Sequence, residues 1–205
     1  MSDLVFFNNA KAIASQAKLL GIEKVIVSSD GKIPPVKGIE FRSCAVLQKL
    51  NFEEARKFRQ KGFLAAVDGA SLSANRFAAS TKGIDLLLQP LDAGKMFFDS
   101  GLAQLCARNN VSVAFLFSAF LNAKPFEQAQ LFRNAAIVVK LLRRFKIKAC
   151  VFSGAESEWE MRSPKDLKVF ARLLGFTEKE AGKAVGENPD ELFSEKTVKG
   201  FRVLK

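Results

Sequence analysis

The sequence predicts an α/β protein in which parallel strands alternate with helices, as a (β/α) barrel or a doubly wound sheet. Two observations carry this prediction. Short runs that are apolar at every position, such as residues 25–27 and 84–88, are typical of strands covered on both faces. Amphipathic stretches with helix-capping residues separate these runs in a regular order. With 205 residues the chain can bury a core, and we expect one domain over residues 1–205.

The strands are expected where β-branched and aliphatic residues cluster between turn-forming residues. This criterion gives seven runs, at residues 4–7, 25–27, 41–47, 63–67, 84–88, 111–117 and 149–152. The segment 31–38 contains Pro34 and Pro35 between two glycines and is expected to be a loop. The tail from Glu187 is ambiguous, and residues 201–204 are a candidate for a last short strand.

The helices are expected where an apolar stripe at helical spacing follows a capping residue or a proline. Asn8 or Asn9 caps the first helix and Asn51 the second, while Pro125 and Pro164 occupy first helical positions. The expected helices cover residues 9–20, 52–60, 71–81, 99–109, 125–145, 164–174 and 177–185.

The composition excludes several classes of protein. The chain has no His, which excludes Ser-His-Asp and Cys-His catalysis and His-ligated zinc. Cys44, Cys106 and Cys150 lie far apart in apolar runs and are expected to be buried thiols in a reducing compartment. No signal peptide or membrane-length apolar run is evident, so we expect a soluble, cytoplasmic protein. The net charge of +11 favours a polyanionic partner.

The sequence offers few groups for catalysis. Asp68 is the only carboxylate directly after a strong strand, and with Asp92, Asp99 and Glu156 it leaves a carboxylate-bound Mg²⁺ site as an alternative. The favoured interpretation of Asp99 is a helix cap. No glycine-rich phosphate loop occurs, and the turn at 153–155 is better explained as an ordinary tight turn than as a phosphate site.

The basic residues are more informative. On the expected helix 125–145 an apolar stripe defines the buried face, and Arg133, Lys140 and Arg144 lie on the other side. Further basic residues follow at Arg143, Lys146 and Lys148. Smaller basic clusters occur at residues 56–61 and 162–168. A solvated helix face explains any one of these clusters, but together with the net charge they favour a phosphate-binding surface.

Three segments together resemble a known family. They are Ser71-Leu-Ser-Ala-Asn75-Arg76 with Gly83-Ile-Asp85, then the helix start at residues 125–134, and finally Phe152-Ser153-Gly154-Ala155 with Arg162-Ser163-Pro164-Lys165-Asp166-Leu167. In this order they resemble archaeal ribonuclease P protein component 3, the counterpart of the thirty-kilodalton subunit of the eukaryotic enzyme. The resemblance covers residues 63–193, and the turn 153–155 followed by the 162–167 segment is its most specific part.

The resemblance implies a TIM-barrel-like fold of seven or eight parallel strands surrounded by helices. It implies a non-catalytic subunit of a ribonucleoprotein whose RNA removes 5′ leaders from precursor tRNA, with Mg²⁺ held by the RNA and no cofactor or metal bound by the protein. The implied partners are ribonuclease P RNA, precursor tRNA and a small ferredoxin-like protein subunit (component 2), in a heterodimer or heterotetramer. The alternatives are a carboxylate/Mg²⁺ barrel phosphoesterase led by Asp68 and a general RNA-binding protein.

Carried over to this chain, the resemblance points to Arg76, Arg162 and Lys165 as RNA or assembly contacts, whereas Asp166 is better explained as a first-turn carboxylate. With the basic clusters, the candidate RNA-binding or assembly residues are Arg76, Arg133, Lys140, Arg143, Arg144, Arg162 and Lys165. Two positions depart from the family pattern: Ser118 stands where Arg is frequent, and Ser100 where His is frequent.

Overall fold

The fold is a barrel of seven parallel strands, as seen in a computed structural model that describes residues 1–69 and 71–194. The strands lie side by side in sequence order, so each strand pairs with the next along the chain. They are β1 (Ser2–Val5), β2 (Lys24–Ser28), β3 (Glu40–Val46), β4 (Leu64–Asp68), β5 (Leu86–Leu88), β6 (Ser112–Leu116) and β7 (Ala149–Phe152). The TIM-barrel-like prediction is confirmed; the candidate strand at 201–204 lies outside the described residues.

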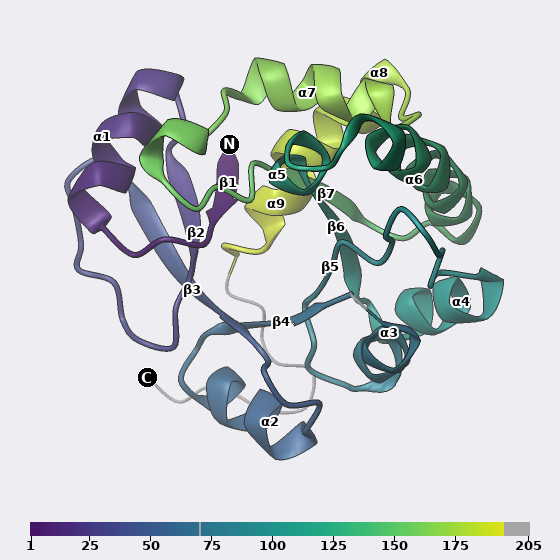
Figure 1. The fold of residues 1–205 in the computed structure, drawn as a ribbon. Coiled ribbons are helices and arrows are strands. Elements are labelled where there is room, and N and C mark those ends of the chain that lie inside the picture. Colours follow the sequence, from purple (N-terminus) through teal and green to yellow (C-terminus); the bar gives the residue numbers. More distant parts are fainter. Residues whose placement is uncertain (70, 195–205) are drawn as a thin grey trace.

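Helices surround the strands (Figure 1). The helices are α1 (Ala10–Leu20), α2 (Phe52–Gln60), α3 (Leu72–Ser80), α4 (Ser100–Asn109), α5 (Phe117–Leu121), α6 (Pro125–Phe145), α7 (Pro164–Leu173), α8 (Glu178–Gly182) and α9 (Asn188–Glu191). A 3₁₀ turn, η1 (Glu158–Glu160), precedes α7, and a π-helical turn, η2 (Lys183–Glu187), joins α8 to α9. No helix within residues 1–69 and 71–194 combines the length and apolar character needed to span a bilayer.

Local sequence explains most helix boundaries. The side chains of Asn9, Asn51, Ser71, Asp99 and Ser163 each accept a hydrogen bond from a backbone N–H of the first turn, as the capping prediction requires. Gly21 ends α1 in the left-handed conformation. The boundaries of α2, α6 and β7 agree with those expected.

Several expected boundaries were wrong. The expected strand 4–7 lies two residues earlier, at Ser2–Val5. The expected strand 111–117 ends at Leu116 because Phe117 turns inward to begin the unexpected helix α5. The expected strand 84–88 is shorter, since Asp85 precedes β5 and its carboxylate bonds to other elements. The expected helix 177–185 is divided into α8 and η2, and η2 leads into α9.

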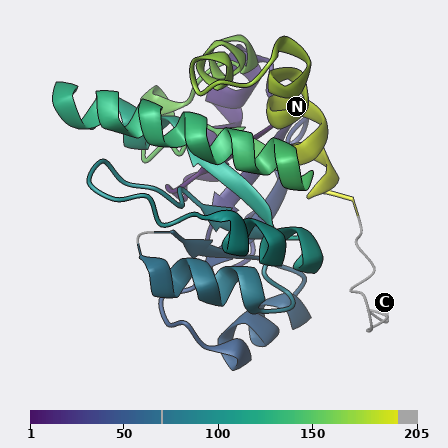
Figure 2. The same cartoon turned by 90° about the vertical axis from the view of Figure 1, so that its right-hand side faces the viewer.

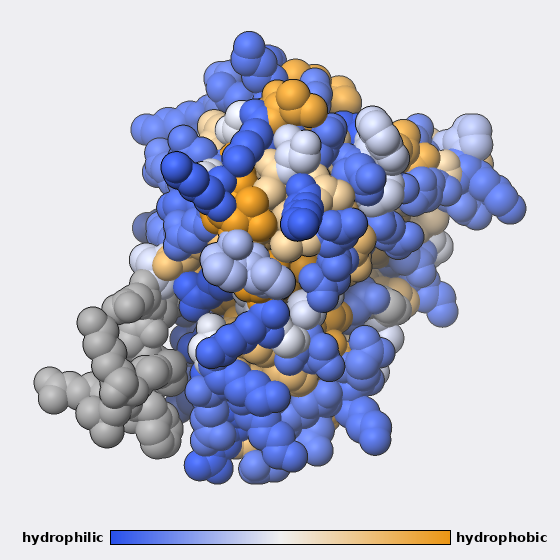
Figure 3. All heavy atoms as spheres, turned by 90° about the vertical axis from the view of Figure 1, so that its left-hand side faces the viewer, coloured by the Kyte–Doolittle hydropathy of each residue, from blue (hydrophilic) through white to orange (hydrophobic). Residues whose placement is uncertain are grey.

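The core has two layers, as expected for strands that are apolar on both faces. One set of alternating strand residues, including Leu4, Ile26 and Leu86, fills the barrel interior together with Leu192 beyond α9. The other set packs outward against the helices; Val25 and Val27, for example, contact the α1 residue Ile13. The face that carries α1 is covered mostly by hydrophilic side chains (Figure 3).

A buried contact between the first and last strands closes the barrel. Asp3 is fully buried, and its carboxylate accepts hydrogen bonds from the backbone N–H of Ser153 at 2.7 Å and from the Ser153 hydroxyl at 2.6 Å. Next to it, the Gly154 N–H donates to the Leu4 carbonyl at 3.1 Å, and the Phe6 N–H to the Ala155 carbonyl at 2.7 Å. The turn at 153–155 is therefore the element that joins β7 to β1.

Gly154 has a steric reason to be glycine. Its φ is +63°, and a Cβ atom there would lie 2.6 Å from the Ser118 Oγ and 3.1 Å from the Leu116 Cβ. The Ser118 N–H donates to the Ser153 carbonyl at 2.9 Å. Ser118, which departs from the family pattern, therefore packs against the β7–β1 seam.

A second buried contact holds the opposite end of the barrel. The Arg59 guanidinium of α2 donates to both Asp85 carboxylate oxygens, at 2.5 and 2.6 Å, and Asp85 also accepts from the Ala65 N–H at 3.0 Å. Asp85 is only 6% exposed, so this ion pair is well shielded from water. It connects α2 to β4 and to the start of β5.

The raised pKa of the buried Asp3 carboxyl group should make the stability of the protein depend on pH. Burial raises its pKa from 3.8 to about 6, so its contribution to stability is complete below pH 3.8 and is lost as the pH rises through 6. We expect the free energy of unfolding to fall by roughly 1.4 kcal/mol from this group between pH 5 and pH 7. Denaturant titration at both pH values should show this change in the wild type and not in Asp3→Asn. The chain has no His to titrate in this window; equal changes in both proteins would contradict the prediction.

Gly154→Ala should destabilise the barrel through a clash as well as a strained backbone. Gly62 provides the matched control, since its φ is +78° and a Cβ there would meet no atom within 4 Å. We expect Gly62→Ala to cost about 1–2 kcal/mol and Gly154→Ala about 2 kcal/mol more, with part of the excess recovered in Gly154→Ala/Ser118→Ala. Equal losses in thermal or denaturant unfolding for the two single variants would show that the seam tolerates a methyl group.

Candidate nucleic-acid interface

The outer face of α6 carries a row of exposed cations. Within the helix, Arg133 donates a hydrogen bond to Gln130, and Arg144 lies over the Phe145 ring at 5.5 Å from its centroid. Arg133, Lys140 and Arg144 are exposed and lie on the side of the helix opposite the buried residues, as the sequence predicted. The rise of an α-helix places Lys140 about 10 Å beyond Arg133, and Arg144 about 6 Å further along. The helix lies across the outside of the barrel, and one of its ends projects beyond the neighbouring helices (Figure 2). We call these three residues the α6 basic row.

The barrel separates the cations that the sequence predicts as one phosphate-binding surface. Each helix returns from the carboxyl end of one strand to the amino end of the next. Arg162 and Lys165, at the start of α7, therefore lie toward the carboxyl ends of the strands. Lys140, Arg143 and Arg144 lie toward the opposite end, just before β7. No single small patch contains the whole predicted set.

Arg143 is committed to an intramolecular ion pair. Its guanidinium donates to both carboxylate oxygens of Glu180 at 2.7 Å and to the Gly175 carbonyl at 3.2 Å. The hydrogen bond from Arg143 lowers the pKa of Glu180 to about 2, and the same bond raises the pKa of Arg143. Arg143 thereby ties α6 to α8 and is a weaker candidate for RNA contact than its neighbour Arg144.

Arg162 is likewise engaged within the fold. Its guanidinium donates to the carbonyls of Trp159 at 3.0 Å and Met161 at 3.1 Å, and it lies over the Phe117 ring at 5.4 Å from the centroid. The side chain links η1 to the start of α5. These three partners of Arg162 are neutral groups.

Arg76 and Lys165 remain available for contact with a partner molecule. Both are exposed, and neither has a side-chain acceptor among residues 1–69 and 71–194. Their neighbours in the recognised segments serve the fold instead. Asn75 is buried and donates to the Phe97 carbonyl at 2.8 Å, and Asp166 accepts from the Ser163 hydroxyl at 2.7 Å in the first turn of α7. The structural interpretation of Asp166 is confirmed.

A groove beside the first half of α6 was not anticipated. It has a volume of about 870 Å³ and lies between α6 and the loop after β5. Phe126, which is 76% exposed, lines it together with Arg133 and Asn134. An exposed aromatic ring next to an Arg is a combination that can bind an unstacked base and its phosphate. The helical spacing of Phe126 with Gln130 and Arg133 was the signal available in the sequence.

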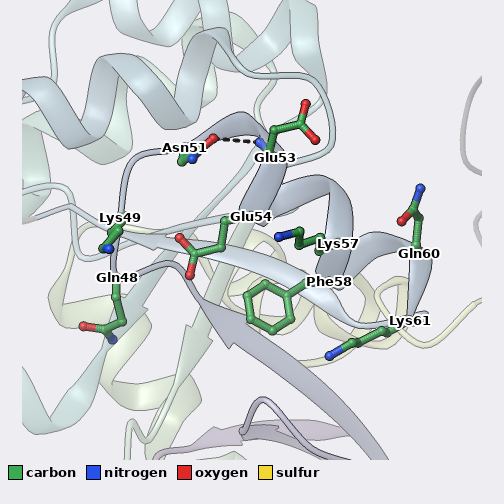
Figure 4. A pocket seen from close by; sticks show the side chains of 9 residues that line it. All are labelled: Gln48, Lys49, Asn51, Glu53, Glu54, Lys57, Phe58, Gln60 and Lys61. Carbon is green, nitrogen blue, oxygen red and sulfur yellow. Dashed lines mark hydrogen bonds between the residues drawn. The ribbon is translucent and has the colours of Figure 1, made fainter.

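The basic cluster on α2 is less suited to phosphate. Arg59 is occupied by Asp85, and the Lys61 Nζ lies 5.7 Å from the Phe58 ring centroid. Lys49, Lys57 and Lys61 share an open hollow of about 640 Å³ with Glu53 and Glu54, as Figure 4 shows. The two carboxylates reduce the positive potential of this hollow.

The acidic residues do not form a metal centre. Among residues 1–69 and 71–194, no three Asp, Glu or Cys side chains converge as a ligand set. Asp99 caps α4 by accepting from the Leu102 N–H at 2.8 Å, as expected. Asp68 is exposed at the end of β4, and partial burial of its carboxyl group raises its pKa. Neither Asp68 nor Asp99 therefore belongs to a group of three such side chains within the described residues.

Comparison with known proteins identifies one family whose sequences match this chain. The family model described as RNase P subunit p30 matches residues 7–199. Ribonuclease P protein component 3 of Thermococcus gammatolerans is 33% identical over 73% of this chain and 70% of its own length. Its counterpart from Thermococcus kodakarensis is 34% identical over 61% of this chain. The match covers 57% of the latter protein, so the chain aligns with little more than half of that relative.

A solved structure supports the same fold. A chain in the structure of archaeal ribonuclease P with mature tRNA superposes with a TM-score of 0.79 and 20% identity. The superposition covers 94% of this chain and 89% of that one. The family resemblance inferred from residues 71–85, 125–134 and 152–167 is confirmed by the match over nearly the whole chain. The protein belongs to the RNase P subunit p30 family.

Proposed function

We propose that this chain is a non-catalytic protein subunit of ribonuclease P, which supports a catalytic RNA in removing 5′ leaders from precursor tRNA. The observation that carries the proposal is the family match over residues 7–199. The relatives are named as protein components of ribonuclease P, and the similar solved structure is of that enzyme with tRNA. RNA is the polyanionic partner that a charge of +11 favours.

The RNA contacts in this proposal come from cations that the fold leaves free. The α6 basic row can meet successive phosphates, since about 6 to 10 Å separates its neighbours along the helix. Arg76 adds a contact from α3, whereas Lys165 on α7 serves assembly with a protein partner. Arg143 and Arg162 act mainly by holding α8 and η1 in place, so their substitution reduces RNA binding through the fold.

The chemistry in this proposal belongs to the RNA. The chain has no His, and its described residues provide no converging carboxylates for Mg²⁺. The Mg²⁺ required for hydrolysis is held by the RNA, and the protein binds no cofactor. We further propose that the chain joins the RNA together with a small ferredoxin-like subunit, component 2, as a heterodimer or heterotetramer in the cytoplasm.

The α6 basic row should determine both RNA affinity and its salt dependence. Replacing Arg133, Lys140 and Arg144 with Ala should weaken binding to the ribonuclease P RNA about 10- to 100-fold near 100 mM salt. It should reduce the slope of log affinity against log salt by about 2–3. The matched control removes the same charge from the α2 hollow, as Lys49→Ala, Lys57→Ala and Lys61→Ala. Equal losses in filter-binding titrations of both triple variants would mean that only net charge matters.

Reconstitution tests whether the RNA or the protein carries out the cleavage of precursor tRNA. The purified chain with Mg²⁺ or Mn²⁺ should not cleave precursor tRNA, whereas its addition to the RNA with component 2 should raise the cleavage rate. Asp68→Asn should retain this stimulation. Metal-dependent hydrolysis of a phosphoester by the chain alone, lost in Asp68→Asn, would instead establish the phosphoesterase alternative. Equal affinity for unrelated structured RNAs would favour a general RNA-binding protein.

A further inference from the structure

An apolar groove lies between α7 and the helices α5 and α6. It has a volume of about 280 Å³, which is below the usual size of a small-molecule site and suits one or two anchoring side chains. Nine residues line it, and the polar ones are Gln128 and Asp166. The Gln128 side chain donates to the Phe120 carbonyl at 2.9 Å, so its amide is already engaged.

The floor of the groove is a preformed aromatic cluster. The Phe170 ring contacts Phe117 and Phe120 edge-on, with centroids 5.1 and 5.0 Å apart, and Phe132 packs on Phe120 at 5.0 Å. Arg162 lies over the Phe117 ring, as described above. A floor held by mutual ring contacts needs little reordering when a ligand binds, which favours affinity.

The walls expose more apolar surface than a solvated helix pair requires. Val169 and Leu173 lie one turn apart on α7 and are 60% and 64% exposed, and Leu121 faces the groove from α5 at 49%. A contiguous apolar patch of this kind marks an interaction surface more often than free solvent contact. RNA is a poor occupant, because the groove offers apolar side chains and the Asp166 carboxylate would repel phosphate.

The charges beside the groove indicate the chemistry of its occupant. Lys165 and Arg172 lie four residues before and three residues after Val169, so both share its face of α7. Both are exposed; Arg172 contacts the exposed Glu178 at 3.3 Å, and that carboxylate is also bound by Lys168 at 2.5 Å. The apolar strip on α7 therefore has Lys165 one turn before it and Arg172 beside it.

We propose that this groove is the docking site for an amphipathic helix of another protein, with apolar anchors on one face and carboxylates beside them. A channel between two helices accommodates a third helix through anchors at helical spacing, and Lys165 and Arg172 would pair with the flanking carboxylates. The proposal rests on the proposed function in one respect, since it places the chain in a complex with a protein partner. It assigns that partner to a surface different from the RNA-binding one.

Site-specific crosslinking in the native complex tests the proposal. A photoreactive p-benzoylphenylalanine replaces Val169 in the full chain expressed in its own cells, and mass spectrometry identifies the crosslinked peptide. We expect a segment of another protein with apolar residues at helical spacing and adjacent Asp or Glu. The control places the same group at Leu19 on α1, which is 79% exposed and should give no such product. A crosslink to RNA, to a second copy of this chain or to nothing would overturn the proposal.

Charge reversal and loss of RNA binding separate this proposal from the proposed function. Lys165→Glu with Arg172→Glu should reduce the crosslink at least tenfold, and Leu173→Asp should do the same through the apolar wall. The triple Ala variant of the α6 basic row should lose RNA binding and keep the crosslink. If charge reversal leaves the crosslink yield unchanged, the proposal that carboxylates flank the docked helix is wrong. Circular dichroism and thermal unfolding confirm that each variant is folded.

Discussion

The contact between the Asp3 carboxylate and Ser153 is the interaction on which the architecture depends. A barrel of parallel strands must join its first strand to its last. Here Asp3 on the first strand and Ser153 after the last are 150 positions apart in the sequence. Beyond the single paired position Val5–Ala155, the seam relies on this carboxylate and on the close approach that Gly154 permits. Because the helices pack on the strands, the placement of the α6 basic row and of the apolar groove depends on closure of this seam.

The residues that carry the family resemblance serve mainly the fold. Ser153 and Gly154 close the barrel, Asp85 anchors α2, and Asn75 holds the segment before α4. These positions constrain the barrel tightly. Ser118 adds a small side chain that lies against the seam beside Gly154.

Much of the fold could be predicted from sequence because its determinants are local. Capping by Asn9, Asn51 and Asp99 and the apolar stripe of α6 depend on residues within a few turns of each other. Closure could not be predicted from the pattern alone, because a doubly wound sheet has the same local sequence. The partner of Arg143 could not be predicted either, since Glu180 lies 37 residues away and is brought near by tertiary packing. The candidate set therefore divides into cations that hold the fold and cations that remain free.

In the proposed function, the barrel is a scaffold that presents exposed cations to one structured RNA. The most direct test of this function is to recover the tagged chain from its native cells and sequence the RNA that accompanies it. We expect strong enrichment of a single structured RNA together with precursor tRNAs that carry their 5′ leaders. A broad mixture of RNAs, or no RNA, would contradict the proposed function.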